Sequence, residues 1–178
     1  MRVQESPDVG EKVRPGDLSE RVGVAELRAR GVDVAELVAK LAEAAAAALA
    51  AHYRYTVLAL HLAGNADHRE LCDALARQSR DHLEGCLPRI RQLGGALPDE
   101  VTQFAGLADR TEVPGGDPLI AMLETERDAI RTWWEICDLT TGRDFPTCAL
   151  AARILAEKVA NEARLIDVLS AERDAAGI

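Results

Sequence analysis

The chain has 178 residues, with 21 Lys and Arg side chains against 30 Asp and Glu side chains and a formal net charge of −9. This length suits one domain with a buried core, and the negative charge argues against nucleic-acid binding because phosphates would be repelled. No stretch approaches the roughly 20 apolar residues of a membrane span and the N-terminus does not resemble a secretory signal, so we expect a cytoplasmic protein without membrane contact.

Glycine, proline and capping residues divide the chain into segments. Residues 1–20 mix Pro, Gly and charge without periodicity, which predicts a flexible N-terminal arm. A short helix is predicted over residues 24–30, with Gly31 at its end. Asp33 is placed to cap the first long helix, in which apolar and small residues recur at steps of three and four until about residue 63.

The second long helix is followed by a long connection. The helix is predicted over residues 66–93, with Gly94 as its terminator and a kink at Pro88. Residues 96–116 contain two prolines and a Gly-Gly pair around a weak helical stretch at 100–107. A connection of this length is what a crossover between two helices of the same direction requires.

Two further helices complete the pattern. Asp117 and the proline after it form an N-cap and first position, which predicts a third long helix over residues 118–140. A fourth is predicted over residues 146–171. Four long helices with two short turns and one crossover predict an all-α, up-down-down-up four-helix bundle over residues 21–174, with the crossover between the second and third helices.

The four cysteines show no close pair of the kind that binds zinc: Cys72, Cys86, Cys137 and Cys148. Cys72 and Cys86 would lie about 21 Å apart along one helix, too far for a disulfide within one chain. We interpret all four as reduced. Small apolar packing is the favoured role and a reactive thiol is the alternative.

Several short blocks on these helices match a known family in order and spacing. They are HYRYT at residues 52–56, DHLE at 81–84, LGGALP at 93–98, ETER at 124–127 and AIRTW at 129–133. Through these blocks, residues 22–169 resemble the Dps-like branch of the ferritin-like superfamily, known as DpsL or thioferritin. The resemblance implies a ferritin-like bundle in a twelve-subunit cage that oxidises ferrous iron with peroxide at a two-iron site inside each bundle.

The resemblance also identifies six ligand positions. The family places Glu on the first helix, Glu-x-x-His on the second, Glu on the third and Glu-x-x-His on the fourth, so that each pair shares one helix face. Carried onto this chain, these positions hold Ala48, Ser79, His82, Glu126 (with Glu124 as an alternative register), Lys158 and Asn161. Two of the six keep a ligating side chain, and the family's third-helix cysteine position falls on Asp128.

These substitutions predict a different use of the cavity. A buried Glu126 without a metal requires a compensating cation, and Lys158 is placed on the inner line of its helix to supply it. We therefore predict an ion pair between these two side chains, with His82 bordering the same cavity. Catalytic roles are predicted for His82, Lys158 and Glu126, and substrate-binding roles for His52, Tyr55, Ser79, Asn161 and Trp133.

Each of these interpretations has a purely structural alternative. Lys158 would extend to solvent, His82 would be a satisfied core histidine, and His52 would pack at the bundle wall. Trp133 and Trp134 are neighbours on one helix, so they cannot both face inward. One is expected in the core and the other at an interface or at the crossover.

Three functions remain open. The first is a metal-free protein whose vacated two-iron cavity binds a small molecule, as a cofactor-independent acid/base enzyme for a cyclisation or elimination step in biosynthesis and not as a ferroxidase. The second is a catalytically silent cage or structural protein that modulates a partner. The third holds a single metal ion through His82, Glu126, Glu162 and His52. We expect a homo-oligomer, a dimer or higher, because an exposed tryptophan needs covering.

Overall fold

The computed structural model describes residues 21–62, 64–97 and 117–177, together with residues 100, 102, 104 and 106 of the crossover. Within this part the chain forms helices and no strand. A short helix α1 (Val22–Ala29) precedes four long ones: α2 (Val34–His61), α3 (Ala66–Gln92), α5 (Pro118–Thr140) and α6 (Phe145–Ala176). The predicted N-terminal arm and most of the helical stretch at 100–107 lie outside the described residues.

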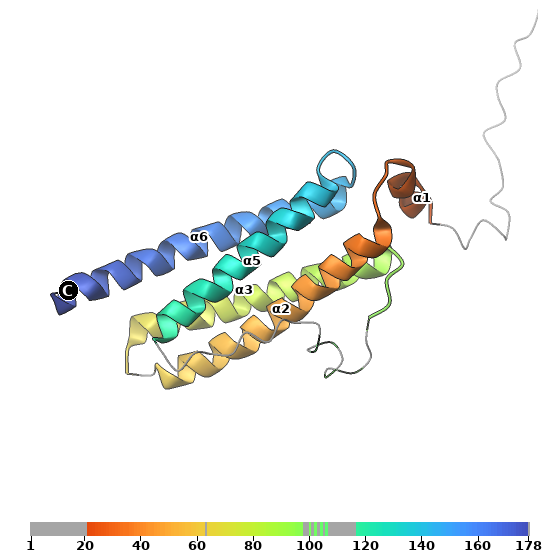
Figure 1. The fold of residues 1–178 in the computed structure, drawn as a ribbon. Helices are drawn as coiled ribbons and strands as arrows, with labels where there is room; N and C mark the ends of the chain where they lie inside the picture. The colour runs from red at the N-terminus through yellow and green to blue at the C-terminus, as the bar shows by residue number, and fades with distance from the viewer. Residues whose placement is uncertain are drawn as a thin grey trace, which may run out of the picture.

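The four long helices lie side by side as two antiparallel pairs, α2 with α3 and α5 with α6 (Figure 1). Helix α5 runs in the same direction as α3, so it begins at the opposite end of the bundle from the end of α3 (Figure 1). Helix α2 also packs on α5, and α3 on α6. The predicted all-α, up-down-down-up four-helix bundle is therefore confirmed.

Side-chain caps explain where the long helices begin. The carboxylate of Asp33 accepts hydrogen bonds from the backbone N–H groups of Ala35 and Glu36 at 2.9 and 3.0 Å. The same arrangement is found at the first residues of the other three helices, where the caps are Asn65, Asp117 and Asp144. These side chains satisfy N–H groups that have no partner within the helix, which fixes each start.

The ends of the helices differ slightly from the predictions. Helix α3 continues through Pro88 to Gln92, and α2 ends at His61. Helix α6 extends beyond its predicted end near residue 171, as far as Ala176. Gly177 then adopts a left-handed conformation with φ of 72°, which is the usual terminator of a helix.

The bundle core consists of two apolar clusters along its axis. One surrounds Leu41, Ile90 and Ile154, and the other surrounds Leu71 and Met122. Between them lies a polar layer to which α3, α5 and α6 contribute fully or nearly fully buried side chains: Ser79, His82, Glu126 and Lys158. Four of the six ligand positions that the family resemblance implies lie in this layer, so it is the candidate site.

The two neighbouring tryptophans separate as predicted. Trp133 is buried, while Trp134 is 55% exposed. None of the described helices combines the length and the apolar character that crossing a membrane would require.

Candidate functional site in the polar layer of the bundle

Glu126 on α5 is the centre of the polar layer and is completely buried. Its Oε1 accepts hydrogen bonds from Lys158 Nζ at 2.8 Å and from the Tyr55 hydroxyl at 2.6 Å. Its Oε2 accepts one from Asn161 Nδ2 at 2.8 Å. The predicted ion pair between Lys158 and Glu126 is therefore present, and both carboxylate oxygens are occupied.

The helices deliver these donors from two sides. Tyr55 comes from α2, whereas Lys158 and Asn161 are three residues apart on α6 and therefore share one face. Lys158 is 4% exposed, so the alternative in which it extends to solvent is wrong. Burial, and then the neighbouring Glu126 carboxylate, raise the pKa of Tyr55 well above its ordinary value, which keeps its hydroxyl protonated as a donor.

His82 forms a second polar contact in the layer. Its Nε2 lies 2.6 Å from Glu157 Oε2, and Arg153 Nη1 donates to the other oxygen of Glu157 at 2.9 Å. Burial lowers the pKa of His82 below its ordinary value; Lys158 and Arg153 act in the same direction, and the Glu157 contact opposes them. The imidazole is therefore neutral at pH 7, with its single proton on Nε2 toward the carboxylate.

Glu157 keeps its charge in this arrangement. Partial burial raises the pKa of its carboxyl, but the hydrogen bonds from His82 and Arg153 outweigh this and hold the pKa below its ordinary value. His82 Nδ1 is buried and has no hydrogen-bond partner among the described residues. The structural alternative, a core histidine whose hydrogen bonds are all made, therefore holds for Nε2 but not for Nδ1.

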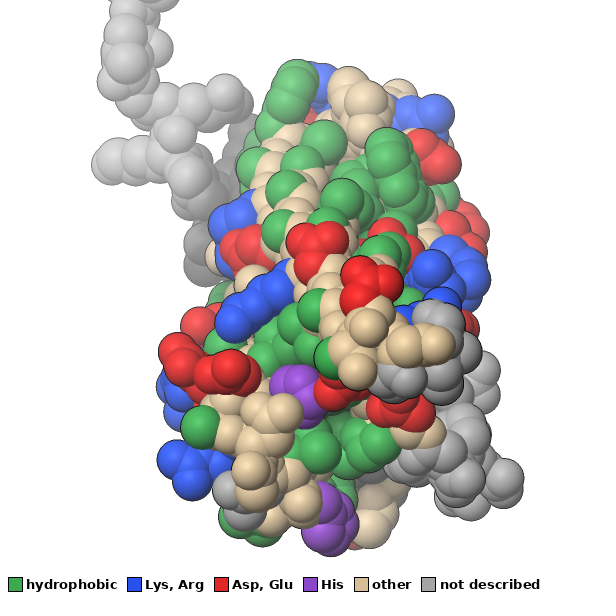
Figure 2. All heavy atoms as spheres, turned by 90° about the vertical axis from the view of Figure 1, so that its left-hand side faces the viewer, with side chains coloured by type: hydrophobic (Ala, Val, Ile, Leu, Met, Phe, Trp, Pro, Cys, Tyr) green, Lys and Arg blue, Asp and Glu red, His purple; other side chains and the backbone are tan. Residues whose placement is uncertain are grey.

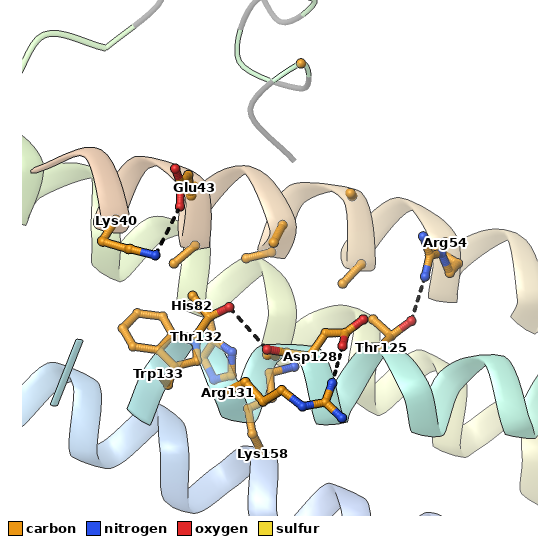
Figure 3. Close-up of a pocket in the computed structure, with 17 residues that line it drawn as sticks. Lys40, Glu43, Arg54, His82, Thr125, Asp128, Arg131, Thr132, Trp133 and Lys158 are labelled. Carbon is orange, nitrogen blue, oxygen red and sulfur yellow. Dashed lines mark hydrogen bonds and ion pairs between the residues drawn. The ribbon is translucent and has the colours of Figure 1, made fainter. Parts of the chain in front are cut away.

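A groove of about 840 Å³ between α2 and α5 reaches His82 and Lys158 (Figure 3). One wall is apolar, formed by alanines of α2 from Ala44 to Ala51, and Ala129 and Trp133 of α5 contribute to the opposite side. Charged side chains of α2 and α5 also line it, namely Lys40, Glu43, Arg54, Asp128 and Arg131, together with Thr125, Thr132 and Gly106. Figure 3 shows that His82 and Lys158 approach from the remaining two helices.

Only some of the residues predicted to form the site line the groove. Trp133 lines the groove, as do His82 and Lys158. Tyr55, Ser79 and Asn161 do not line it: Tyr55 and Asn161 hold Glu126, and Ser79 Oγ is buried without a partner in the described part of the chain. Glu126 is likewise behind the groove wall. These four residues support the site and do not face the groove.

His52 is not part of the groove either. Its Nδ1 lies 2.9 Å from the backbone carbonyl oxygen of Ala76 on α3. The geometry therefore favours the packing alternative for His52 over the predicted substrate-binding role, because the helix turns this side chain toward α3 and not toward α5.

The donor set does not fit the family's two-metal centre. Ala48, Ser79, Lys158 and Asn161 provide neither a carboxylate nor an imidazole, and the oxygens of Glu126 are already bound. Among the described residues, no three His, Cys, Asp or Glu side chains converge on a point that would hold a metal ion. The ligands named for the third hypothesis do not converge either, since Glu162 pairs with Arg127 at 2.8 Å.

Two contacts of the polar layer were missed by the sequence analysis. In the first, Glu157, the neighbour of Lys158 on α6, contacts His82. In the second, Gln78 Oε1 accepts a hydrogen bond from Asn161 Nδ2 at 2.5 Å. An Arg and a Glu four residues apart, Arg153 and Glu157, signal an ion pair on α6. That spacing does not reveal His82 as the further partner, because His82 lies on another helix.

All four cysteines are free thiols. Burial raises the pKa of Cys72 to about 11 and that of Cys86 to about 12, and it also raises the pKa of Cys137. Cys148 is half-buried. The reduced state predicted for the cysteines agrees with the structure.

Comparisons with known proteins agree with this architecture. A family model described as a ferritin-like domain matches residues 38–174. The DNA protection during starvation protein of Pyrococcus furiosus is 36% identical over 148 residues, which cover 79% of this chain and 80% of that protein. A dodecameric thioferritin from Bacteroides fragilis superposes with a TM-score of 0.80 at 29% identity, covering 86% of this chain and 95% of that chain.

Proposed function

The chain belongs to the ferritin-like family, and on this premise we propose that a metal-free small-molecule site has replaced the family's two-metal centre. The observation that carries this proposal is the ion pair between Lys158 Nζ and Glu126 Oε1, which supplies the positive charge that a metal would supply. The groove of about 840 Å³ ends at the same Lys158 and lies within the range of roughly 300–1,000 Å³ typical of ligand pockets.

Iron storage or protection is the second candidate function. Its support is the family itself, since one relative is a thioferritin and another is named for DNA protection during starvation. Two-iron chemistry within the bundle would require Glu126 to be freed from its hydrogen bonds to Lys158 and Asn161. It would also require carboxylates in place of these two side chains. The observed donors therefore favour the metal-free site.

We also propose that the chain works as a homo-oligomer, a dimer or higher. Large apolar side chains remain exposed on the single chain, including Tyr53 at 71%, Leu60 at 73% and Trp134 at 55%. Figure 2 shows hydrophobic side chains between the charged ones over one end of the bundle. Burying such surface is a common reason for association. A light-scattering mass equal to one chain at micromolar concentration would contradict the proposal.

The groove can be tested with a fluorescent apolar probe, anilinonaphthalene sulfonate. We expect the probe to bind the wild-type protein and Ala48→Phe to abolish this signal, because the new ring would fill the groove beside His82. Ala39→Phe on the exposed face of α2 is the matched control and should bind like wild type. Equal binding by all three proteins would overturn the assignment of the ligand site to the groove. It would favour the silent cage.

A further inference from the structure

At the inner end of the groove, Glu157 and His82 form a carboxylate–imidazole pair of a kind found in catalytic sites. This pair is separate from the ion pair of Lys158 with Glu126. Glu157 holds His82 Nε2 at 2.6 Å, which leaves Nδ1 buried and without a partner in the described residues. We propose that this end of the groove is an acid/base site for small apolar carbonyl compounds, in which His82 removes a proton next to the carbonyl and Lys158 stabilises the resulting enolate. The inference rests on the proposed groove function and specifies its chemistry.

His82 has the geometry of a general base. Because the Nε2 proton points to Glu157, the lone pair of Nδ1 is available to accept a proton. When Nδ1 becomes protonated, the Glu157 carboxylate is in place to stabilise the imidazolium, as a carboxylate does in a hydrolase triad. Glu157 acts through His82, so it is a positioning residue.

Lys158 has the geometry of an oxyanion stabiliser. An ammonium carries three N–H bonds, and within the described part of the chain Nζ has one hydrogen-bond acceptor, Glu126 Oε1. Lys158 is 4% exposed and lines the groove together with His82. A carbonyl oxygen placed there would accept an N–H···O hydrogen bond from this nearly fully buried cation, and fixed donors of this kind stabilise developing negative charge strongly.

The apolar part of the groove next to His82 and Lys158 suggests the substrate class. The alanines of α2 and the ring of Trp133 suit a small hydrocarbon body, with the carbonyl at the polar end. The C–H bond next to the carbonyl breaks, its electron pair forms the enolate double bond, and the carbonyl π electrons move to oxygen. The proton resides on Nδ1 until it returns to the same carbon or to a conjugated one, or until it exchanges with water, after which a solvent proton or deuteron is delivered to the carbon in its place. The step is an isomerisation or proton exchange, so it requires no oxidant, reductant or second substrate.

The test uses β-tetralone, an apolar ketone with acidic C–H bonds, in heavy water. Proton NMR follows the loss of the signals next to the carbonyl as deuterium enters. We expect the wild-type protein to accelerate exchange over buffer, and His82→Gln to lower that acceleration by about a hundredfold, in line with the usual contribution of a general base. Equal acceleration by wild type and His82→Gln, or none by wild type, would overturn the inference.

The bundle offers a matched control for this histidine. His68 also lies on α3 and contacts a glutamate of α6, with Nε2 3.3 Å from Glu172 Oε1, but it does not line the groove. His68→Gln should exchange the ketone like wild type. Circular dichroism of both variants establishes that they fold, so a loss confined to His82→Gln assigns the base.

Glu157 requires a readout that a merely structural role would not change. Glu157→Gln keeps an oxygen that accepts the Nε2 proton but removes the charge. We expect the maximal exchange rate to fall while the concentration of β-tetralone that half-saturates it stays constant. A parallel fall in probe binding would contradict the positioning role.

Displacement of the fluorescent probe by β-tetralone separates this inference from the groove function. Displacement without catalysed exchange would refute the acid/base chemistry and leave the groove as a binding site. Failure of the ketone to displace a probe that Ala48→Phe excludes would refute the substrate class. Probe binding that Ala48→Phe leaves unchanged would refute the proposed groove function itself.

Discussion

Lys158 Nζ lies 2.8 Å from Glu126 Oε1 in the interior of the bundle, where the side chains are 5% and 0% exposed. Two opposite charges removed from water cost solvation energy, which their attraction and additional hydrogen bonds offset. Here Tyr55 and Asn161 provide those additional hydrogen bonds to the carboxylate. The Glu126 carboxylate is therefore held by three donors, of which Lys158 supplies the opposite charge.

Removing the lysine charge alone should be costly. We expect Lys158→Met to lower the free energy of unfolding by about 3 kcal/mol, because it leaves Glu126 buried without a cation. Urea unfolding at fixed protein concentration measures the change. The double variant Lys158→Met with Glu126→Gln should recover most of the loss, since no charge is then left unpaired. A double variant as unstable as the single one would show that packing and not charge is responsible.

The protein should not oxidise iron at a two-metal site in the bundle. Wild-type protein mixed with ferrous ion and peroxide is expected to show no oxidation above buffer, because four of the six family positions lack a ligating group. Absorbance of ferric species and metal content after desalting are the measurements. Iron near two atoms per chain with peroxide-dependent oxidation would contradict the prediction. Restoring Glu at 48, 79 and 158 and His at 161 should increase metal binding.

His82 should make stability depend on pH below its ordinary pKa. Burial lowers its folded-state pKa, with Lys158 and Arg153 acting in the same direction against the Glu157 contact, so the unfolded chain binds more protons than the folded one. As far as it depends on His82, the free energy of unfolding is then highest above about pH 6.5, and it falls as the pH drops from there through the folded-state pKa. Urea unfolding at several pH values should show this slope. His82→Gln should remove it.

Glu157 adds a separate effect at lower pH. Its folded-state pKa is lowered, so its contribution is present above its unfolded pKa and disappears as the pH falls through the folded one. The two windows are therefore distinguishable. A slope near pH 6 that persists in His82→Gln would assign it to a different group.

Thiol reagents should distinguish Cys148 from the other cysteines. A thiolate is the reactive form, and the pKa of about 11 for Cys72 and about 12 for Cys86 keeps both protonated at pH 8. We expect iodoacetamide to label Cys148 first in the folded protein and all four thiols in urea. Peptide mass spectrometry gives the order. Early labelling of Cys86 would indicate that the bundle opens locally.

Gly95 should not tolerate a side chain. A Cβ at this position would lie 2.7 Å from Val38 Cγ1 and 2.7 Å from Ile90 Cγ2, so the end of α3 and the start of α2 would have to move apart. We expect Gly95→Ala to destabilise by about 1–3 kcal/mol, as overpacked positions do. Gly23→Ala in α1 is the control, because its added methyl meets nothing within 4 Å. Thermal unfolding of the two variants provides the comparison.

The fold followed from local signals. The caps Asp33 and Asp117 mark helix starts, and the three-to-four periodicity between caps and glycines marks the helices. The end of α6 was misplaced because the chain has no terminator between residue 171 and Gly177. Local signals therefore set helix number and order, while the last turns depend on where a glycine occurs.

Part of the candidate site could also be predicted from the sequence. The ion pair of Lys158 with Glu126 follows from inward helix lines and the cost of a buried unpaired charge. Glu157 was missed because it lies next to Lys158 on α6, about 100° around the helix, and reaches His82 only through the placement of α6 against α3. The orientation of His52 toward α3 could not be predicted for the same reason, because it depends on the rotation of α2 in the bundle, which sequence spacing leaves open.

The cation that accompanies Glu126 is covalently attached to the chain, so its local concentration is fixed by the fold. A dissociable metal would stabilise the folded state by mass action, increasingly as its free concentration rises, and would leave the carboxylate uncompensated when scarce. Lys158 removes this linkage. For the metal-free site proposed above, we therefore expect newly synthesised chains to complete the polar layer under iron starvation and iron excess alike, without a response to the metal supply.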